Sequence, residues 1–488
     1  MKKLLGILMA LAAVVGVNAQ ERDFEEYRKQ ASERFDSFKA KKQQEFEDFR
    51  TKANAEFAEL MRKKWEAYRA IAGIPAPPSP DPVKPPVADP KTPPTADPVP
   101  FKEIEPIPEP VTPPQPIVPI PEPSQPGKQT FVFSFYHTEC KVSLAPGQKI
   151  FLPDLSEKSI AEAWVQLTDP QYNSLINDCL QLRSRMDLCD WAYIQLLQTL
   201  TEKYYQSTVS NEAVLLQMYI LTQSGYKVRI AKSGNRLALL IPSNQTIYSY
   251  TYFNLSGENY YVIDKSLQET TFNIFDRAFP QEQTLSLHSR PPHFAQANTA
   301  VKAFSSAVYP EIKVSVSTNK NLMDFYNTYP VHSGWELYAA ASMSESLKSE
   351  LYPALRNAIA GKSEAEAANR LINFVQTAFA YQTDDKQFGY ERPLFADEIF
   401  YYPYSDCEDR SILFSVLVRE LLNLEVVLLH YPNHLATAVH FNDNSVSGDY
   451  LMINGKKFIV CDPTYINASI GNAMPKFKNV SAEVVRFP

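Results

Sequence analysis

Two similar stretches of the chain decide its fold: GYKVRIAKSGNRLALLI from Gly225 to Ile241 and NLEVVLLHYPNHLATAV from Asn423 to Val439. They align without a gap at a separation of 198 positions, and the match extends downstream to Asp264 and Asp462. Shared asparagine, glycine and aspartate residues at one separation favour a duplication over chance similarity between two amphipathic segments. We therefore expect two related domains in tandem, near residues 128–300 and 301–488.

The second copy shows the expected elements most clearly. Helical periodicity covers residues 365–379 and 410–422. Alternating apolar residues predict strands at 425–429, 435–441, 450–453 and 457–461, and Asn454-Gly455 is a typical hairpin turn. Helices followed by antiparallel strands indicate an α+β fold.

Residues 1–19 have the pattern of a secretory signal peptide. Lys2 and Lys3 form a positively charged start, residues 4–17 are apolar, and Val17-Asn18-Ala19 is a small-residue cleavage site. An uncleaved membrane anchor is the alternative, but the apolar run is shorter than the roughly 18–20 residues that a span needs. We expect an exported protein, periplasmic or secreted or at the cell surface, without a transmembrane span after signal removal.

Residues 20–73 are predicted to form one long helix with an 11-residue repeat. Aromatic residues mark the repeat at Phe24, Phe35, Phe46, Phe57 and Tyr68. A period of 11 residues predicts a right-handed supercoil in any coiled coil. A regular aromatic stripe on a charged helix favours self-association or docking on a surface. The alternative is a helix that packs back on the globular part of its own chain.

A proline-rich linker is predicted at residues 74–127. Residues 75–126 hold 22 of the 38 prolines of the chain. Proline removes a backbone donor and fixes φ, so we expect neither helix nor sheet here. An extended polyproline II spacer is the predicted form, and recognition by a proline-binding module is the alternative.

Composition narrows the classes of function. The 488 residues carry a formal net charge of −7, which does not indicate nucleic-acid binding. The chain has five cysteines. Because this number is odd, an exported protein of this kind has at least one free thiol or one disulfide between chains. A disulfide between Cys179 and Cys189 is left open. No cofactor and no metal is expected.

Three residue types with complementary chemistry occur in order in the second copy. Ser405-Asp406-Cys407-Glu408 has the capping-box pattern, which predicts Ser405 as the N-cap and Cys407 in the first helical turn. A helix N-terminus favours the reactive thiolate, although the neighbouring carboxylates oppose it. His434 begins a predicted strand and Asp462 ends a later one. Nucleophile, base and orienting acid in this order predict a catalytic triad.

On these motifs, residues 365–465 resemble the transglutaminase-like superfamily, a branch of the papain-like fold. The segments that carry the resemblance are YSDCEDRSILFSVLVRELL, NHLATAVHF and FIVCDPTY. The resemblance implies Cys407 as nucleophile, His434 as base and Asp462 as orienter. Leu435 follows the histidine where the commoner family form has Ala-Trp, which weakens inference about the substrate. Gln382 and Gln387 are weak candidates for the oxyanion residue.

The first copy lacks the triad. Arg236 aligns with His434, Asp264 is kept, and the matching helix begins near Val209-Ser210-Asn211 without a cysteine. We therefore expect a degenerate first domain and an active second one. The expected function is cysteine-dependent hydrolysis of an amide in a peptide, a protein or a peptidoglycan-like polymer. The alternative is a non-catalytic binding or assembly protein with vestigial papain-like domains.

Overall fold

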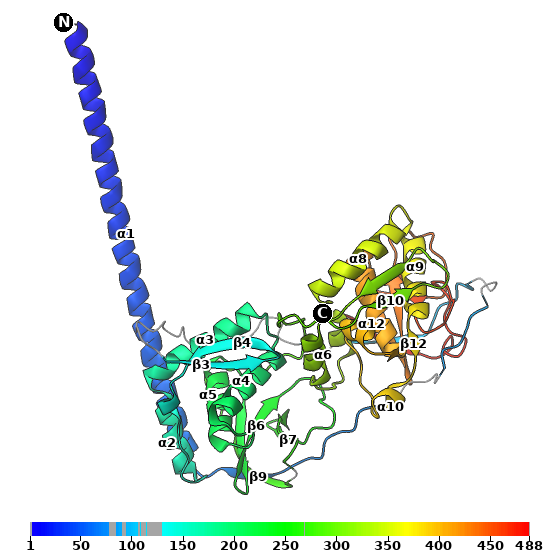
Figure 1. Ribbon diagram of the computed structural model, residues 1–488, viewed down its shortest axis with the longest axis horizontal. Coiled ribbons are helices and arrows are strands. Elements are labelled where there is room, and N and C mark those ends of the chain that lie inside the picture. The colour runs from blue at the N-terminus through cyan, green and yellow to red at the C-terminus, as the bar shows by residue number, and fades with distance from the viewer. Residues whose placement is uncertain are drawn as a thin grey trace.

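The computed structural model describes residues 2–77, 84–89, 94–105, 108, 114, 129–267 and 269–487, with side chains described from residue 28 onward. Its fold is α+β, as predicted. Figure 1 shows two lobes and a long helix, α1 (Lys2–Met61), that projects from the first lobe. We call residues 129–300 the first lobe and residues 301–487 the second lobe.

The first lobe is built on a six-stranded sheet with the order β1-β9-β5-β6-β8-β7. All of its neighbouring strands are antiparallel. The strands are β1 (Glu66–Arg69), β5 (Arg229–Ser233), β6 (Arg236–Pro242), β7 (Tyr252–Leu255), β8 (Glu258–Val262) and β9 (Thr271–Phe275). A separate hairpin joins β3 (Thr130–Phe135) to β4 (Thr138–Ser143).

Helix α5 of the first lobe packs on two other helices, α4 and α2, and on strand β6. Serine N-caps begin two of these helices, because Ser156 Oγ accepts from Ser159 N–H and Ser210 Oγ accepts from Ala213 N–H. The helices are α2 (Glu157–Leu167), α3 (Asn173–Arg185), α4 (Asp190–Tyr205) and α5 (Asn211–Gln223), with short turns η1 (Pro146–Gln148) and η2 (Pro170–Tyr172).

The second lobe holds another six-stranded sheet, with the order β16-β17-β15-β14-β18-β2. Its strands are β2 (Phe101–Ile104), β14 (Glu425–Tyr431), β15 (His434–His440), β16 (Tyr450–Ile453), β17 (Lys456–Cys461) and β18 (Ala482–Val485). Two smaller ladders pair β10 (Lys302–Ser305) with β11 (Lys313–Val316), and β12 (Ala380–Tyr381) with β13 (Tyr404–Ser405). Asn454 and Gly455 both have positive φ, so the predicted hairpin turn is confirmed.

The central helix of the second lobe, α12 (Cys407–Leu417), is buried along its whole length and packs on β15. It continues as the π-helical turn η3 (Val418–Leu422). A capping box of Ser363 and Glu366 begins α9, which confirms the predicted helix at this place. The other helices are α6 (Lys320–Asn327), α7 (Trp335–Ala340), α8 (Glu345–Ile359), α9 (Glu364–Ala378), α10 (Asp384–Gln387) and α11 (Ala396–Tyr401).

The two sheets correspond at the separation found in the sequence. Strand β6 begins at Arg236 and β15 at His434, and 434 − 236 gives 198. The same separation relates the starts of β7 and β16 and those of β8 and β17. The order β9-β5-β6-β8-β7 in one sheet matches β18-β14-β15-β17-β16 in the other. This equivalence supports a duplication.

The long helix ends earlier than the predicted residue 73. Helix α1 stops at Met61, and the chain then forms β1, where Tyr68 pairs with Phe272 of β9. The helical prediction for residues 62–73 is therefore wrong. The sheet edge of the first lobe provides backbone partners, and burial of Trp65 stabilises the extended path. Such tertiary contacts override a local helical period.

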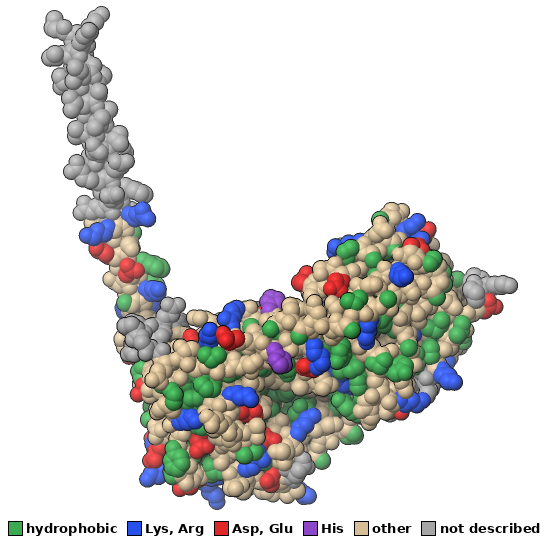
Figure 2. Space-filling model, in the orientation of Figure 1, with side chains coloured by type: hydrophobic (Ala, Val, Ile, Leu, Met, Phe, Trp, Pro, Cys, Tyr) green, Lys and Arg blue, Asp and Glu red, His purple; other side chains and the backbone are tan. Residues whose placement is uncertain are grey.

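One end of the aromatic stripe of α1 packs on the globular part of the chain, and another part of the stripe is exposed. Phe57 is buried, with ring centroids 5.0 Å from Trp164, Phe275 and Phe279. Phe35 and Phe38 are instead 65% and 60% exposed. The C-terminal end of the helix thus packs on the first lobe, while its described outer part projects away (Figures 1 and 2).

The proline-rich segment is not merely a spacer. Phe101–Ile104 forms the edge strand β2, parallel to β18 of the second lobe. Val99 is buried, and its N–H donates to Tyr450 O at 2.9 Å. The prediction that residues 74–127 contain no sheet is therefore wrong. An edge strand tolerates flanking prolines because only one of its sides pairs with the sheet.

Helix α6 and the chain that follows it join the lobes through aromatic contacts. Tyr326 of α6 stacks on Phe395 with ring centroids 4.4 Å apart, and Phe325 lies 5.7 Å from Phe294 of the first lobe. The buried apolar cluster of the first lobe continues through these rings to Leu435 on β15. The lobes therefore share a core.

Over the part of the chain that the structure describes, no helix combines the length and apolar character that a membrane span requires. The signal peptide predicted at residues 1–19 stays a prediction, because the side chains of residues 1–27 lie outside the described part.

Candidate active site

The nucleophile candidate lies at the start of the central helix, one residue nearer to the N-cap than predicted. Asp406, not Ser405, is the N-cap of α12, so Cys407 is its first helical residue. Asp406 N–H donates to Asp409 Oδ2 at 3.2 Å, which takes the place of the predicted bond to Glu408. Pairing of β13 with β12 fixes Ser405 in extended backbone, and this moves the helix start forward.

Cys407, His434 and Asp462 come together in the second lobe. His434 is the first residue of β15, and Asp462 directly follows β17, the neighbouring strand. His434 Nε2 and Asp462 Oδ2 are 2.9 Å apart. The backbone N–H of Leu435, next to His434, is hydrogen-bonded to Cys407. The structure therefore brings the three predicted residues to one place.

The tautomer of His434 follows from its partners. Because Nε2 faces the Asp462 carboxylate, it is the nitrogen that donates in this contact, and Nδ1 is then the nitrogen that can act as a base. Nδ1 is buried and has no hydrogen-bond partner. A base held by a carboxylate through one nitrogen, with the other free to take a proton, is the arrangement that thiol activation requires.

The site is closed in this conformation. Cys407 is 1% exposed and His434 2% exposed. Phe477 covers His434, with ring centroids 4.7 Å apart and planes inclined by 5°. Phe477 could not be identified from the sequence, because it lies in a segment after β17 without helix or strand.

The surroundings of Cys407 favour the protonated thiol. Burial first, and then the Asp406 carboxylate, raise the pKa of Cys407 well above its usual value, while the Leu435 N–H lowers it. The thiol donates to Glu408 Oε2 at 3.1 Å. The helix N-terminus was expected to favour the thiolate, and here burial and the adjacent carboxyl outweigh it.

Tyr381 is a further residue of the site that the sequence did not indicate. Strand β12 ends at Tyr381, which pairs with Ser405 of β13, two residues before Cys407. Burial, followed by the charge of Cys407, raises the pKa of the Tyr381 phenol. The phenol thus keeps its proton and can donate a hydrogen bond. Two-residue strands leave no recognisable sequence pattern, which is why this placement was missed.

The other predicted candidates lie elsewhere. Gln387 is held by Tyr404, whose N–H donates to Oε1 and whose carbonyl accepts from Nε2. Gln382 is half-buried, and no contact of its side chain places it at the sulfur. His440, the last residue of β15, is also not at the site, because its Nδ1 lies 3.0 Å from the Lys457 carbonyl oxygen. Neither glutamine is thus identified as the oxyanion residue, and His434 is the histidine of the site.

All five cysteines of the chain are free thiols and are buried. The Cys179–Cys189 pairing left open by the sequence is therefore not formed. Cys461, the neighbour of Asp462, faces the apolar core of the second lobe. Cys407 lies beside the carboxyl groups of Asp406 and Glu408 at the start of α12.

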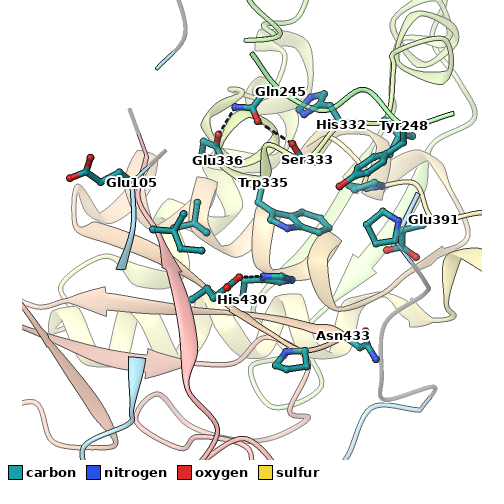
Figure 3. Close-up of a pocket in the computed structure, with 17 residues that line it drawn as sticks. Glu105, Gln245, Tyr248, His332, Ser333, Trp335, Glu336, Glu391, His430 and Asn433 are labelled. Atoms are coloured by element: carbon teal, nitrogen blue, oxygen red, sulfur yellow. Dashed lines mark hydrogen bonds and ion pairs between the residues drawn. The ribbon is translucent and has the colours of Figure 1, made fainter. Parts of the chain in front are cut away.

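A cleft between the lobes lies beside this site, since Asn433, the residue before His434, is part of its lining. Its volume is about 440 Å³, and Glu391 is also among its lining residues. Figure 3 shows Trp335 at its centre, with His430 on one side and Tyr248 on the other. Trp335 and His430 ring centroids are 6.0 Å apart. The cleft thus combines aromatic walls with access to the residue that precedes His434.

The wall of the cleft is acidic. Glu336 accepts from Gln245 at 3.1 Å, Glu483 lies 3.0 Å from His430, and Glu105 comes from the proline-rich segment. Burial raises the pKa of Glu336. A cleft with this lining is complementary to neutral or positively charged groups rather than to anions.

The first lobe has different residues at the positions that correspond to the candidate site. Arg236 Nη2 pairs with Asp264 Oδ2, as His434 pairs with Asp462. Asn211 begins α5, and its Oδ1 accepts from Leu237 N–H at 2.8 Å, so it occupies the place of Cys407. Neither an amide nor a guanidinium paired with a carboxylate supplies a nucleophile or a base at neutral pH.

Comparisons with family models, with curated proteins and with solved structures find no match to this chain. The resemblance noted in the sequence therefore rests on the residues and geometry described above.

Proposed function

We propose that the chain is an exported, transglutaminase-like thiol enzyme that hydrolyses an amide bond through a Cys407 acyl-enzyme. The observation that carries the proposal is the 2.9 Å contact of His434 Nε2 with Asp462, beside a cysteine at a helix N-terminus. This contact orients the imidazole so that Nδ1 is free to act as the base.

The mechanism follows from these positions. His434 Nδ1 takes the thiol proton, and the Cys407 sulfur attacks the amide carbonyl carbon. The Tyr381 phenol and the first N–H groups of α12 stabilise the oxyanion. His434 then gives its proton to the departing amine as the carbon–nitrogen bond breaks. Water, deprotonated by His434, attacks the thioester, and the acid product leaves with the thiol restored.

The substrate class follows from the cleft. Its aromatic and acidic lining favours a peptide, protein or peptidoglycan-like segment with neutral or basic groups beside the scissile amide. Because water is the default acceptor, we propose hydrolysis rather than transfer to an amine.

Cleavage of fluorescein-labelled casein and of a peptidoglycan digest by three forms of the chain tests this function. Cys407→Ala is expected to abolish cleavage, whereas Cys461→Ala, a change of another buried cysteine in the same lobe, is expected to retain it. Cleavage that survives Cys407→Ala would overturn the proposal.

A second candidate function is non-catalytic binding or assembly. The near-complete burial of Cys407 and His434 favours it, as does the exposed part of the aromatic stripe on α1. A vestigial site predicts no adduct of Cys407 with any thiol-directed probe under native conditions, together with self-association that depends on Phe35 and Phe38.

A further inference from the structure

The cleft between the lobes is lined by acids from four separate segments, and the catalytic steps proposed above use none of them. These acids come from the proline-rich segment, from α7, from the loop after α10 and from β18: Glu105, Glu336, Glu391 and Glu483. Within the described part of the chain, no lysine and no arginine belongs to the lining. A concave site with this lining attracts cations.

The two histidines of the cleft do not cancel this charge. Burial lowers the pKa of His332 to about 3, so its ring is neutral at neutral pH. His430 Nδ1 lies 3.0 Å from Glu483 Oε2 and balances one carboxylate at most. Glu336 accepts from Gln245 at 3.1 Å, and an amide carries no charge. The carboxyl groups of the cleft therefore outnumber the cations that can compensate them.

An aromatic ring stands among these acids. Figure 3 shows the Trp335 indole at the centre of the cleft, with Glu336 on one side of it and His430, the partner of Glu483, on the other. The indole is only partly buried, and the ring of His430 is inclined to it by 38°, so the two rings do not stack. The negative face of an indole attracts a cation, as the carboxylates do. Ring and acids thus favour the same kind of ligand.

A buried N–H group of the cleft has no acceptor in the protein. His332 lines the cleft and is 3% exposed, and its Nδ1 accepts from Gly334 N–H at 3.2 Å. Nε2 is therefore the protonated nitrogen of the neutral ring, and it has no hydrogen-bond partner. A buried donor without an acceptor is unfavourable. The carbonyl oxygen of a ligand in the cleft can supply the acceptor.

A peptide with an arginine combines the groups that this lining calls for. The cleft volume of about 440 Å³ is more than a small inorganic cation fills. A peptide backbone offers a carbonyl acceptor to His332, and a long cationic side chain reaches Trp335. A guanidinium suits the site better than an ammonium, because it is planar, stacks on aromatic faces and presents a fork of N–H donors to carboxylates.

We propose that the cleft binds an arginine side chain of a peptide, with the guanidinium on the Trp335 ring between the carboxylates of Glu336 and Glu483. Asn433, the residue before His434, lines the same cleft, so the arginine binds beside the candidate active site. A role of this arginine in substrate recognition rests on the function proposed above, whereas the binding itself does not.

Calorimetric titration of the full chain carrying Cys407→Ala tests the proposal, because this form can bind a peptide without cleaving it. The probe is acetyl-Ala-Ala-Arg-Ala-Ala-amide, compared with the same peptide carrying citrulline or lysine in place of arginine. Citrulline keeps the shape of the side chain but lacks its charge, and is expected to bind at least about tenfold more weakly. Lysine keeps the charge but lacks the planar fork, and is expected to bind about threefold more weakly.

Three further changes, each made in the Cys407→Ala chain, locate the site. Trp335→Leu removes the aromatic face and Glu483→Gln removes one carboxylate, and each is expected to weaken binding of the arginine peptide at least about fivefold. Glu345→Gln, at a side chain of α8 that is 87% exposed, is the matched control and should bind as the parent form does. Thermal unfolding verifies that each variant is folded, and Glu483→Gln keeps the test valid if Trp335→Leu is not.

Absence of binding, or equal affinity for the arginine and citrulline peptides, would overturn the proposal. Tighter binding of the lysine peptide would do the same, as would unchanged affinity in both Trp335→Leu and Glu483→Gln. Arginine-dependent binding in a chain whose wild-type form cleaves nothing would refute the proposed function and leave this inference standing.

Discussion

At the scale of single residues, the ionisable groups of the candidate active site are buried, and they differ in whether a partner compensates their charge. His434 and Asp462 compensate each other at 2.9 Å. Cys407 has no such partner, and its neighbours Asp406 and Glu408 are acidic. Catalysis by Cys407 therefore requires proton transfer to His434 when substrate enters, rather than a thiolate that exists beforehand.

The phenol of Tyr381 is predicted to stabilise the transition state. Tyr381→Phe removes one donor to the oxyanion and is expected to lower kcat by roughly 10²-fold with little change in KM. Steady-state kinetics on the substrate cleaved by wild type measures both constants. Tyr404→Phe, a change at an exposed tyrosine of the neighbouring strand, is the matched control and should leave both unchanged. Equal kinetics for Tyr381→Phe and wild type would remove Tyr381 from the mechanism.

His332 is predicted to make stability depend on pH. It lies at the junction of the lobes, where its ring stacks on Tyr338 at 4.4 Å and Nδ1 accepts from Gly334 N–H. Burial lowers the pKa of His332 to about 3. Between that value and about 6.5, the usual value, the unfolded chain binds a proton that the folded chain does not. The free energy of unfolding therefore falls as pH falls, by up to about 1.4 kcal/mol per pH unit.

Urea unfolding between pH 4.5 and 7 measures this contribution. The His332→Leu variant is expected to lose less stability than wild type over that range. The control His137→Leu, at an exposed histidine, should follow wild type. Parallel curves for His332→Leu and wild type would show that His332 is protonated in the folded state.

The sequence indicated candidate site residues where a reactive residue type stands at the end of a predicted helix or strand. Cys407, His434 and Asp462 stand at ends of elements, where a motif can be recognised. Tyr381 and Phe477 reach the site from a two-residue strand and a turn, and only the tertiary fold brings them there. The predicted N-cap, Ser405, was wrong by one residue for the same reason. The pairing of β12 with β13, which holds Ser405 in extended backbone, could not be recognised in the sequence.

At the scale of elements, periodicity predicted the strands of the second sheet and the helix α9. Periodicity failed where a segment is extended because it pairs with a strand from a distant part of the chain. Residues 66–69 continue a helical repeat, yet they form β1 because β9 offers a free edge. Residues 101–104 lie in a proline-rich segment, yet they form β2 because β18 offers one.

The attachment of β2 is predicted to depend on Val99. This side chain is 3% exposed and packs in the same apolar cluster as Val484. Val99→Asp buries a charge without a partner, so the segment should detach. Hydrogen exchange at the amides of Phe101–Ile104 is expected to accelerate at least tenfold. Val87→Asp, at a valine of the same segment that is 68% exposed, should have no effect on it. Unchanged exchange in Val99→Asp would show that other contacts hold β2.

At the scale of the whole molecule, two equivalent sheets have diverged in chemistry. The first lobe keeps the strand order and replaces the histidine by Arg236, which neutralises Asp264. The second lobe has Cys407 and His434 at the corresponding positions. The cleft between the lobes has walls from both of them and from the proline-rich segment.

The central claim is that Cys407 is a nucleophile activated by His434, and labelling with a thiol-directed activity probe tests it most directly. The folded full chain is treated with the probe, digested, and mapped by mass spectrometry. The account predicts an adduct on Cys407 far exceeding those on Cys140, Cys179, Cys189 and Cys461, and its loss in His434→Asn. Absence of an adduct on Cys407, or equal labelling of wild type and His434→Asn, would contradict the account.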